Sequence, residues 1–134
     1  MIMSERGEKA VELFFSGCNC SQAVAGAFCG DYGVPRETFL RICSTFGGGM
    51  RRKEVCGAVT GALMVLGLKY GPDRPDDKEG KEAINAKTAE FMAEFQKRHN
   101  SYLCRDLLSG DARWRDVCGG FVAGAVSLLE EFGA

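Results

Sequence analysis

Apolar residues recur at helical spacing along almost the whole chain, in segments that glycine and proline separate. Val59, Leu63 and Leu66 repeat in this way, and the alternating pattern of a half-buried strand is almost nowhere found. The 134 residues fit one domain, and 46% of them are hydrophobic, which is enough for a core without disulfides. The sequence therefore predicts an all-α fold, a compact bundle of about six helices in a single domain spanning residues 1–134.

Capping and turn residues set the expected ends of the helices. Ser4 fits the N-cap of the first helix. Pro35 fits the first turn of the third, which is expected to carry Phe39, Ile42 and Cys43. The glycine run at 47–49 breaks the chain before the fourth helix. The remaining helices are expected to begin near Ser21, after Asp76 or Asp77, near Leu103 and at about Arg115.

The segment 51–71, RRKEVCGAVTGALMVLGLKYG, is expected to form the fourth helix, with Val55 and Val59 on its apolar face. Its glycines need an explanation, because glycine costs about 1 kcal/mol relative to alanine inside a helix. Small residues allow another backbone to approach closely, so a second helix crossing here would bring its own cysteine near Cys56. Close packing without any chemistry would favour the same ridge. The ridge consists of Gly57, Ala58, Gly61 and Ala62.

The charge balance and the apolar runs limit the classes of partner and location. There are 17 basic and 18 acidic side chains, a net charge of −1, which does not favour nucleic-acid binding. No apolar stretch follows a basic start at the N-terminus, so no signal peptide is expected. The longest apolar run, GAVTGALMVLGL, is about half of the ~20 residues that span a bilayer. We therefore predict a cytoplasmic protein without membrane insertion, and a homodimer is compatible with such a bundle.

Seven cysteines are many for a chain of this length. Because the number is odd, pairing them all in intramolecular disulfides would leave one cysteine unpaired. In a reducing cytosol, cysteines serve more often as redox groups, metal ligands or small buried residues. Four of them fall near expected helix starts, where unpaired N–H groups and the helix dipole lower the pKa of a thiol. These four, named here the cysteine quartet, are Cys20, Cys56, Cys104 and Cys118.

The sequence CGAVTG, from Cys56 to Gly61, resembles the CGAxxG motif of the family named C_GCAxxG_C_C, whose members are proposed to be redox-active. Members carry one cysteine before the motif and two after it, and Cys20, Cys104 and Cys118 resemble these three. The resemblance covers nearly the whole chain. It implies a redox role for the quartet, with an electron partner that the motif does not identify. The cysteines outside this pattern are Cys18, Cys29 and Cys43.

Three functions fit the quartet. Thiol–disulfide exchange would make the protein an oxidoreductase or electron-transfer protein that needs no further cofactor and acts on a redox partner protein. No C-x-x-C motif occurs, so the fold must assemble the reactive pair, and the sequence does not show which cysteines pair. In the alternative, the four sulfurs are metal ligands for zinc or an iron–sulfur cluster, although the usual short ligand spacings are missing.

In the third reading the cysteines are buried packing residues, since cysteine is among the most frequently buried residue types. Cys29 and Cys43 suit this role best, and Cys18 lies in a turn, as a spare ligand or a surface thiol.

Residues near the quartet suggest further roles. The basic residues 51–53 precede Cys56 and would favour its thiolate if they lie near it. His99, the only histidine, would be needed for a Cys–His nucleophile, but near a helix end a capping or exposed role is commoner. Trp114 is expected in the core or at a dimer contact.

Overall fold

The computed structural model describes residues 3–108 and 113–134, and its helical fold confirms the all-α prediction. Within these residues seven α-helices and no β-strand are found, close to the predicted six. The helices are α1 (Glu5–Phe15), α2 (Cys20–Phe28), α3 (Arg36–Ile42), α4 (Gly57–Tyr70), α5 (Lys78–His99), α6 (Cys104–Leu108) and α7 (Trp114–Glu131). Short turns connect α2, α3 and α4, namely η1 (Cys29–Tyr32), η2 (Cys43–Thr45) and η3 (Gly49–Lys53). In the described part of the chain, no helix combines the length and apolar character needed to cross a membrane.

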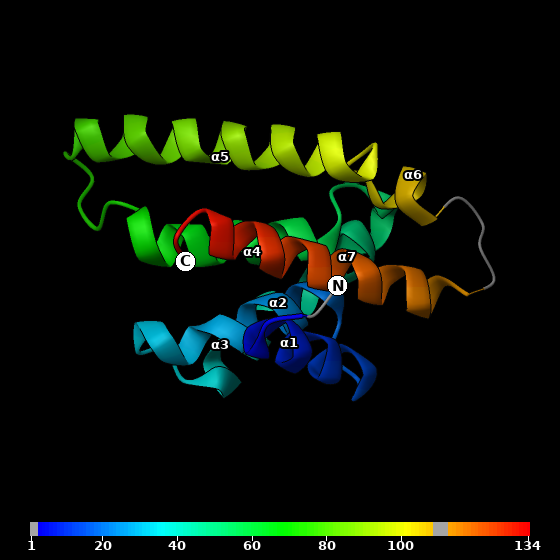
Figure 1. Ribbon diagram of the computed structural model, residues 1–134. Coiled ribbons are helices and arrows are strands. Elements are labelled where there is room, and N and C mark those ends of the chain that lie inside the picture. Colours follow the sequence, from blue (N-terminus) through cyan, green and yellow to red (C-terminus); the bar gives the residue numbers. More distant parts are fainter. Residues whose placement is uncertain (1–2, 109–112) are drawn as a thin grey trace.

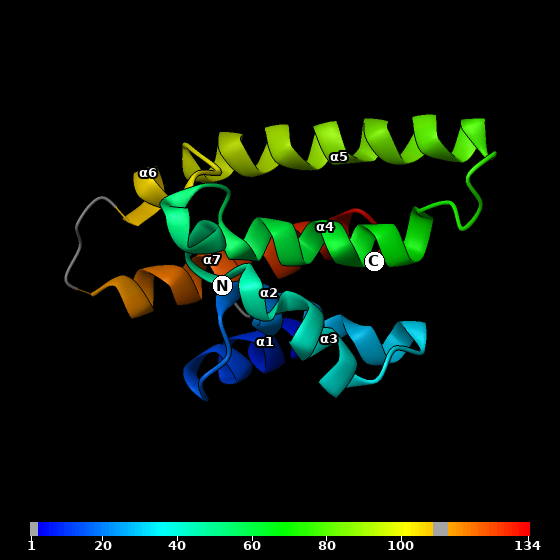
Figure 2. The ribbon, with the colours of Figure 1, turned by 180° about the vertical axis from the view of Figure 1, so that it is seen from behind.

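The helices form three layers (Figure 1). The long helix α5 occupies one side, α4 and α7 lie in the middle, and α1, α2 and α3 form the other side. The reverse view in Figure 2 shows the same order, with α6 beyond the C-terminal end of α5. Helix α2 contacts both α4 and α7, so it joins the outer layer to the middle one.

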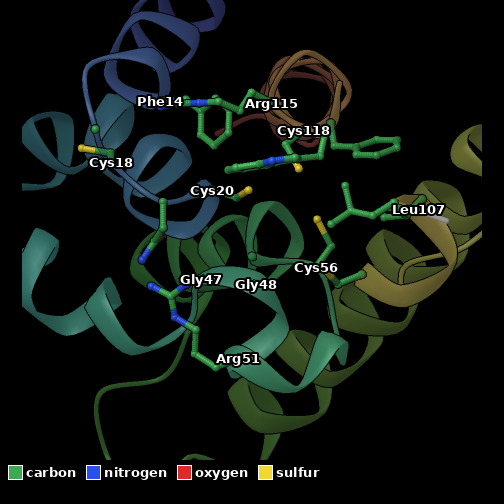
Figure 3. A pocket seen from close by; sticks show the side chains of 17 residues that line it. Phe14, Cys18, Cys20, Gly47, Gly48, Arg51, Cys56, Leu107, Arg115 and Cys118 are labelled. Carbon is green, nitrogen blue, oxygen red and sulfur yellow. The ribbon is translucent and has the colours of Figure 1, made fainter. Parts of the chain in front are cut away.

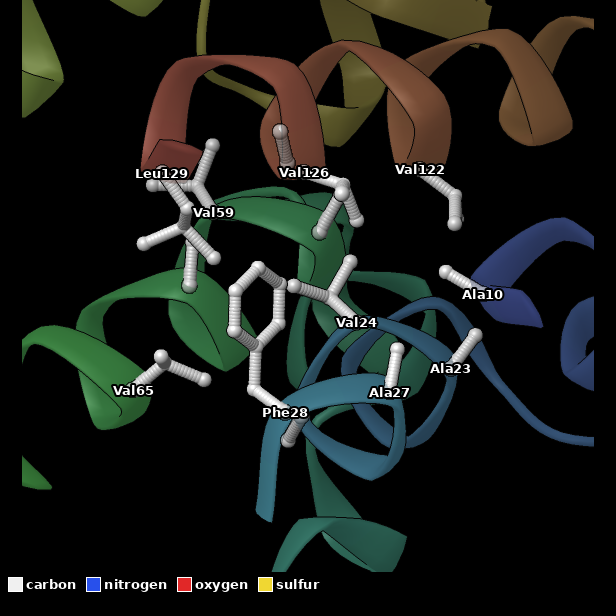
Figure 4. Packing of buried hydrophobic residues seen from close by; sticks show 14 of the residues in the cluster. Ala10, Ala23, Val24, Ala27, Phe28, Val59, Val65, Val122, Val126 and Leu129 are labelled. Atoms are coloured by element: carbon white, nitrogen blue, oxygen red, sulfur yellow. The ribbon is translucent and has the colours of Figure 1, made fainter. Parts of the chain in front are cut away.

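The core lies where α2, α4 and α7 meet (Figure 4). Phe28 of α2 is surrounded by Val59 and Val65 of α4 and by Val126 and Leu129 of α7. All five side chains are fully buried, and burying each contributes about 1.5–3 kcal/mol. This core fixes the relative positions of the three helices that carry or follow three members of the quartet.

Three helix starts are capped by side chains. Ser4 accepts a hydrogen bond from the backbone N–H of Gly7, and Asp77 caps α5, as predicted. Asn19 caps α2 by accepting from the N–H of Gln22, whose side chain accepts from the N–H of Asn19 in return. The reciprocal cap fixes the start of α2 at Cys20, one residue before the predicted start near Ser21.

The prediction that Val55 lies on the apolar face of the fourth helix is wrong. Helix α4 begins only at Gly57, and Val55 lies in an extended segment, paired with Leu103 in an isolated antiparallel bridge. The turn η3 explains the difference, because left-handed backbone angles interrupt the helix before this point. The left-handed residues of η3 other than glycine are Met50, Arg51 and Lys53.

The large apolar side chains of Ile42 and Trp114 lie outside the core. Ile42 is 53% exposed, because the buried positions of this segment, Phe39 and Cys43, are four residues apart and Ile42 lies off their face. Trp114 is 48% exposed at the first position of α7. Of the two places expected for it, the core is excluded and the dimer contact stays a prediction.

Candidate functional site: a pocket lined by four cysteines

All four members of the quartet line one pocket of about 250 Å³ (Figure 3). Cys20 is the first residue of α2, Cys56 immediately precedes α4, Cys104 is the first residue of α6, and Cys118 lies in the second turn of α7. The sulfurs of Cys20, Cys56 and Cys118 point toward a common region in Figure 3. The fold thus assembles in one place thiols that are separated by up to 98 residues, from 20 to 118.

The small-residue ridge of α4 is the place where α2 crosses, as predicted. A Cβ atom on Gly57 would lie 3.1 Å from the Cβ of Cys20 and 3.1 Å from the backbone nitrogen of Ser21. A Cβ atom on Gly61 would lie 2.6 Å from the carbonyl oxygen of Ser21. The two helices therefore meet at backbone contact distance, and this contact places Cys20 beside the start of α4, where Cys56 lies.

A short backbone pairing positions Cys56 and Cys104. The N–H of Cys56 donates to the carbonyl of Tyr102 at 2.8 Å, and the N–H of Cys104 donates to the carbonyl of Glu54 at 2.6 Å. These bonds flank the isolated bridge described above. Because alternate residues of paired extended segments point to the same side, the two cysteines are diagonal neighbours on one face.

The thiols of Cys20 and Cys118 shift each other's pKa in opposite directions. Hydrogen bonding with Cys118, burial and the charges of the other three sulfurs raise the pKa of Cys20, which therefore keeps its proton. The same hydrogen bond lowers the pKa of Cys118, and burial opposes this effect. The first proton lost from the pair leaves Cys118, which gives a thiolate beside a protonated thiol.

The other two thiols are protonated at neutral pH. Burial raises the pKa of Cys56 to about 11, although the backbone N–H groups of the first turn of α4 act in the opposite direction. Burial, followed by the charge of Cys118, raises the pKa of Cys104, while Lys53 lowers it. The prediction that a helix start activates every thiol is thus wrong for Cys20, Cys56 and Cys104, because desolvation and the neighbouring sulfurs outweigh the helix end.

The rest of the pocket is lined by aromatic, aliphatic and basic side chains. Phe14, Trp114 and Leu107 provide apolar surface, and Arg51 and Arg115 provide positive charge. Of the basic run 51–53, which would favour the Cys56 thiolate if it lay near, only Arg51 lines the pocket, and no residue of the run is among the causes that shift the pKa of Cys56. No pattern in the sequence marks the other lining residues, since they meet only when α1, α6 and α7 come together.

No disulfide joins the thiols in this structure. All seven cysteines are free, and no two lie at disulfide distance, so closing a bond requires the sulfur atoms to move together. Among residues 3–108 and 113–134, no group of three or more Cys, His, Asp or Glu side chains is arranged to hold a metal ion.

Comparison with protein-family models connects this pocket to a known pattern. The model described as "Putative redox-active protein (C_GCAxxG_C_C)" matches residues 18–132. The chain belongs to this family. The matched range contains the whole quartet, which confirms the resemblance drawn from the motif at Cys56–Gly61. No curated protein and no solved structure matches the chain.

The three cysteines outside the family pattern are placed differently from the quartet. Cys29 and Cys43 are completely buried away from the pocket, and the sulfur of Cys43 lies 3.4 Å from that of Met64. Both fit the predicted packing role. Cys18 lines the pocket, but its sulfur points away from the other sulfurs in Figure 3.

The only histidine does not line the cysteine pocket. The ring of His99 packs against Phe95, with centroids 4.4 Å apart, and against Phe121 at 5.4 Å. Burial lowers the pKa of His99, so the ring is neutral at pH 7. A Cys–His nucleophile therefore finds no support in this arrangement.

Proposed function

We propose that the protein performs thiol–disulfide exchange, with Cys118 as the attacking thiolate and Cys20 as the thiol that completes the exchange. The observation that carries the proposal is that the quartet lines one pocket, where the sulfurs of Cys20 and Cys118 point toward a common region. The pKa of Cys118 is lowered and that of Cys20 is raised, which assigns their roles. The thiolate is the nucleophile in such reactions, so the two sulfurs have different roles. Membership of a redox-active family supports the same class of chemistry.

The exchange runs in two balanced steps with a disulfide as the oxidant. The Cys118 thiolate attacks one sulfur of the disulfide R–S–S–R, which forms a mixed disulfide and releases one thiolate, RS⁻. Cys20 then attacks the Cys118 sulfur, its proton goes to the second leaving thiolate, and RSH departs. Two electrons have moved from the two cysteines to the disulfide, and a Cys20–Cys118 disulfide remains.

Cys56 and Cys104 supply a second pair of electrons. Exchange inside the pocket converts the Cys20–Cys118 disulfide back to two thiols and forms a Cys56–Cys104 disulfide, with no electrons entering from outside. Because both thiols are protonated and lie diagonally across the backbone pairing, this step needs a displacement of the bridge and is slower than the first.

The test is to oxidise the reduced protein with a limiting amount of a neutral disulfide and to map its bonds by mass spectrometry. We expect loss of two hydrogens and a Cys20–Cys118 bond. Cys118→Ser abolishes fast oxidation, because the serine hydroxyl is not ionised at neutral pH. Cys18→Ser is the matched control, since it removes a thiol that lines the same pocket but points elsewhere, and it leaves the reaction unchanged.

Two results would contradict the proposal. A native mass spectrum of anaerobically purified protein with the added mass of zinc or an iron–sulfur cluster on the quartet would support the metal alternative instead. A protein that keeps all its thiols under mild oxidation would show that the quartet serves packing alone.

A further inference from the structure

The pocket contains two arginines that have no carboxylate partner among the described residues. Arg51 and Arg115 both line it, below and above the sulfurs in the view of Figure 3. The guanidinium of Arg115 lies over the ring of Trp114, at 5.7 Å from its centroid, and neither arginine takes part in an ion pair of the described structure. No described acidic side chain lines the pocket. Since the whole chain carries a net charge of −1, this positive charge is local.

The two arginines do not act on the thiols themselves. Apart from burial and backbone N–H groups, the pKa of each quartet thiol is shifted by the other sulfurs and, for Cys104, by Lys53. Arg51 and Arg115 contribute to none of these shifts. Two exposed cations that line a pocket, without a carboxylate partner among residues 3–108 and 113–134, are suited to an anionic group that enters from solution.

The depth of the sulfurs limits the size of the reacting molecule. Cys56, Cys104 and Cys118 are only 5%, 7% and 8% exposed. With so little of these residues exposed, a small disulfide reaches their sulfurs more readily than a disulfide held on the surface of a folded protein. The pocket has a volume of about 250 Å³, which is the volume that roughly eight water molecules occupy in liquid water. A small molecule with two short arms fits a pocket of this size.

We infer that the oxidising substrate is a low-molecular-mass disulfide with a carboxylate at each end, and this inference rests on the exchange function proposed above. Its central S–S bond meets the thiolate of Cys118, and its carboxylates lie toward Arg51 and Arg115. The apolar walls contact the methylene groups of the arms. The products are two small carboxylate-bearing thiols, one released as thiolate and one protonated, and the Cys20–Cys118 disulfide of the protein.

The experiment compares three small disulfides that differ in charge. Dithiodiglycolate carries two negative charges, bis(2-hydroxyethyl) disulfide carries none, and cystamine carries two positive charges. The rate constant for oxidation of the reduced protein is measured for each in the wild type, Arg51→Gln, Arg115→Gln and the double variant. Arg52→Gln is the matched control, because Arg52 is exposed in the same turn but does not line the pocket. Wild-type to variant ratios cancel the intrinsic reactivity of each disulfide.

We expect each pocket substitution to slow dithiodiglycolate about fivefold and the double variant about 25-fold, from the loss of one charge contact at a water-exposed mouth. The rate constant for oxidation by the neutral disulfide changes less than twofold in these variants, and the rate constant for cystamine does not fall. Arg52→Gln gives the same rate constants as the wild type. At 1 M salt the ratios for dithiodiglycolate shrink, since the contacts are screened.

Equal ratios for all three disulfides, or none above twofold, would overturn the inference. So would a protein that ignores all three but is oxidised by a disulfide-bonded protein, although thiol exchange itself would then stand. A protein that resists both kinds of disulfide would remove the proposed function together with its substrate.

Discussion

The two walls of the cysteine pocket are held together by different kinds of contact. On the α2–α4 side, backbone meets backbone, because Gly57 and Gly61 leave no side chain between Ser21 and α4. On the α6–α7 side, side chains such as Leu107 and Trp114 line the pocket, and Trp114 is half exposed. The first wall depends on the absence of side-chain atoms at two glycines, whereas the second is built from side chains, one of which is half exposed. We therefore expect substitutions in the two walls to have very different effects.

The largest effect is expected at the crossing of α2 and α4. In Gly61→Ala the new Cβ atom would lie 2.6 Å from the carbonyl oxygen of Ser21 and 3.0 Å from its Cα atom. These are backbone atoms, so α2 must shift as a whole. We expect the free energy of unfolding to fall by about 2–3 kcal/mol, measured by urea denaturation, and Cys20 to move away from Cys56.

Gly67→Ala provides the matched control in the same helix. A Cβ atom at this position has no neighbour within 4 Å, so the substitution should stabilise the protein by up to about 1 kcal/mol through helix propensity alone. If the two variants had the same stability, α2 and α4 would not be in backbone contact in solution.

Most of the fold could be predicted from local signals. Apolar spacing, the caps Ser4 and Asp77 and the glycine run at 47–49 locate the helices correctly, because each depends on residues close together in the chain. Val55 was misplaced because it keeps helical spacing with Val59, although it lies in the extended segment between η3 and the start of α4 at Gly57. The left-handed angles at Met50 and Arg51 fall on residues that favour helix, so propensity gives no warning.

The candidate site was predictable only in part. The motif at Cys56 and the ridge of α4 indicated which cysteines could meet, and the pocket contains these four. Their ionisation could not be predicted, since the hydrogen bond between Cys20 and Cys118 joins residues far apart in sequence. Burial, which raises the pKa of Cys56 to about 11, likewise depends on tertiary packing.

An effect of intermediate size is expected at Cys20. Two substitutions there distinguish its role as a hydrogen-bond donor to Cys118 from its role in packing. Cys20→Ala removes the hydrogen bond that lowers the pKa of Cys118. That pKa then rises, so less thiolate is present at neutral pH and the rate profile moves to higher pH. We expect alkylation of Cys118 at pH 7 to slow about tenfold, the effect of losing one hydrogen bond to a charged group. Iodoacetamide labelling followed by mass spectrometry across pH 5–10 measures the profile.

Cys20→Ser restores a donor of similar size and should recover most of the wild-type rate at pH 7. A serine variant as slow as the alanine variant would mean that Cys20 acts on Cys118 only through packing. The analogous test at Cys29, which is buried outside the pocket, should leave the labelling of Cys118 unchanged.

The smallest effect is expected on the looser wall. Trp114 and Cys118 are four residues apart on α7, so their side chains lie on the same face of the helix, and both line the pocket. Since Trp114 is half exposed, Trp114→Ala should lower the free energy of unfolding by less than about 1 kcal/mol. Removing the ring widens the pocket entrance. We therefore expect Cys118 to be alkylated about twofold faster, which corresponds to a decrease of roughly 0.4 kcal/mol in the activation free energy of alkylation.

Leu68→Ala is the control for Trp114→Ala, because Leu68 is 38% exposed and does not line the pocket. It should give a similarly small loss of stability with no change in labelling. The comparison of the two walls would fail if Trp114→Ala destabilised the protein as much as Gly61→Ala. In that case the ring of Trp114 would be a structural support of the pocket, and the α6–α7 wall would be as tightly constrained as the crossing of α2 and α4.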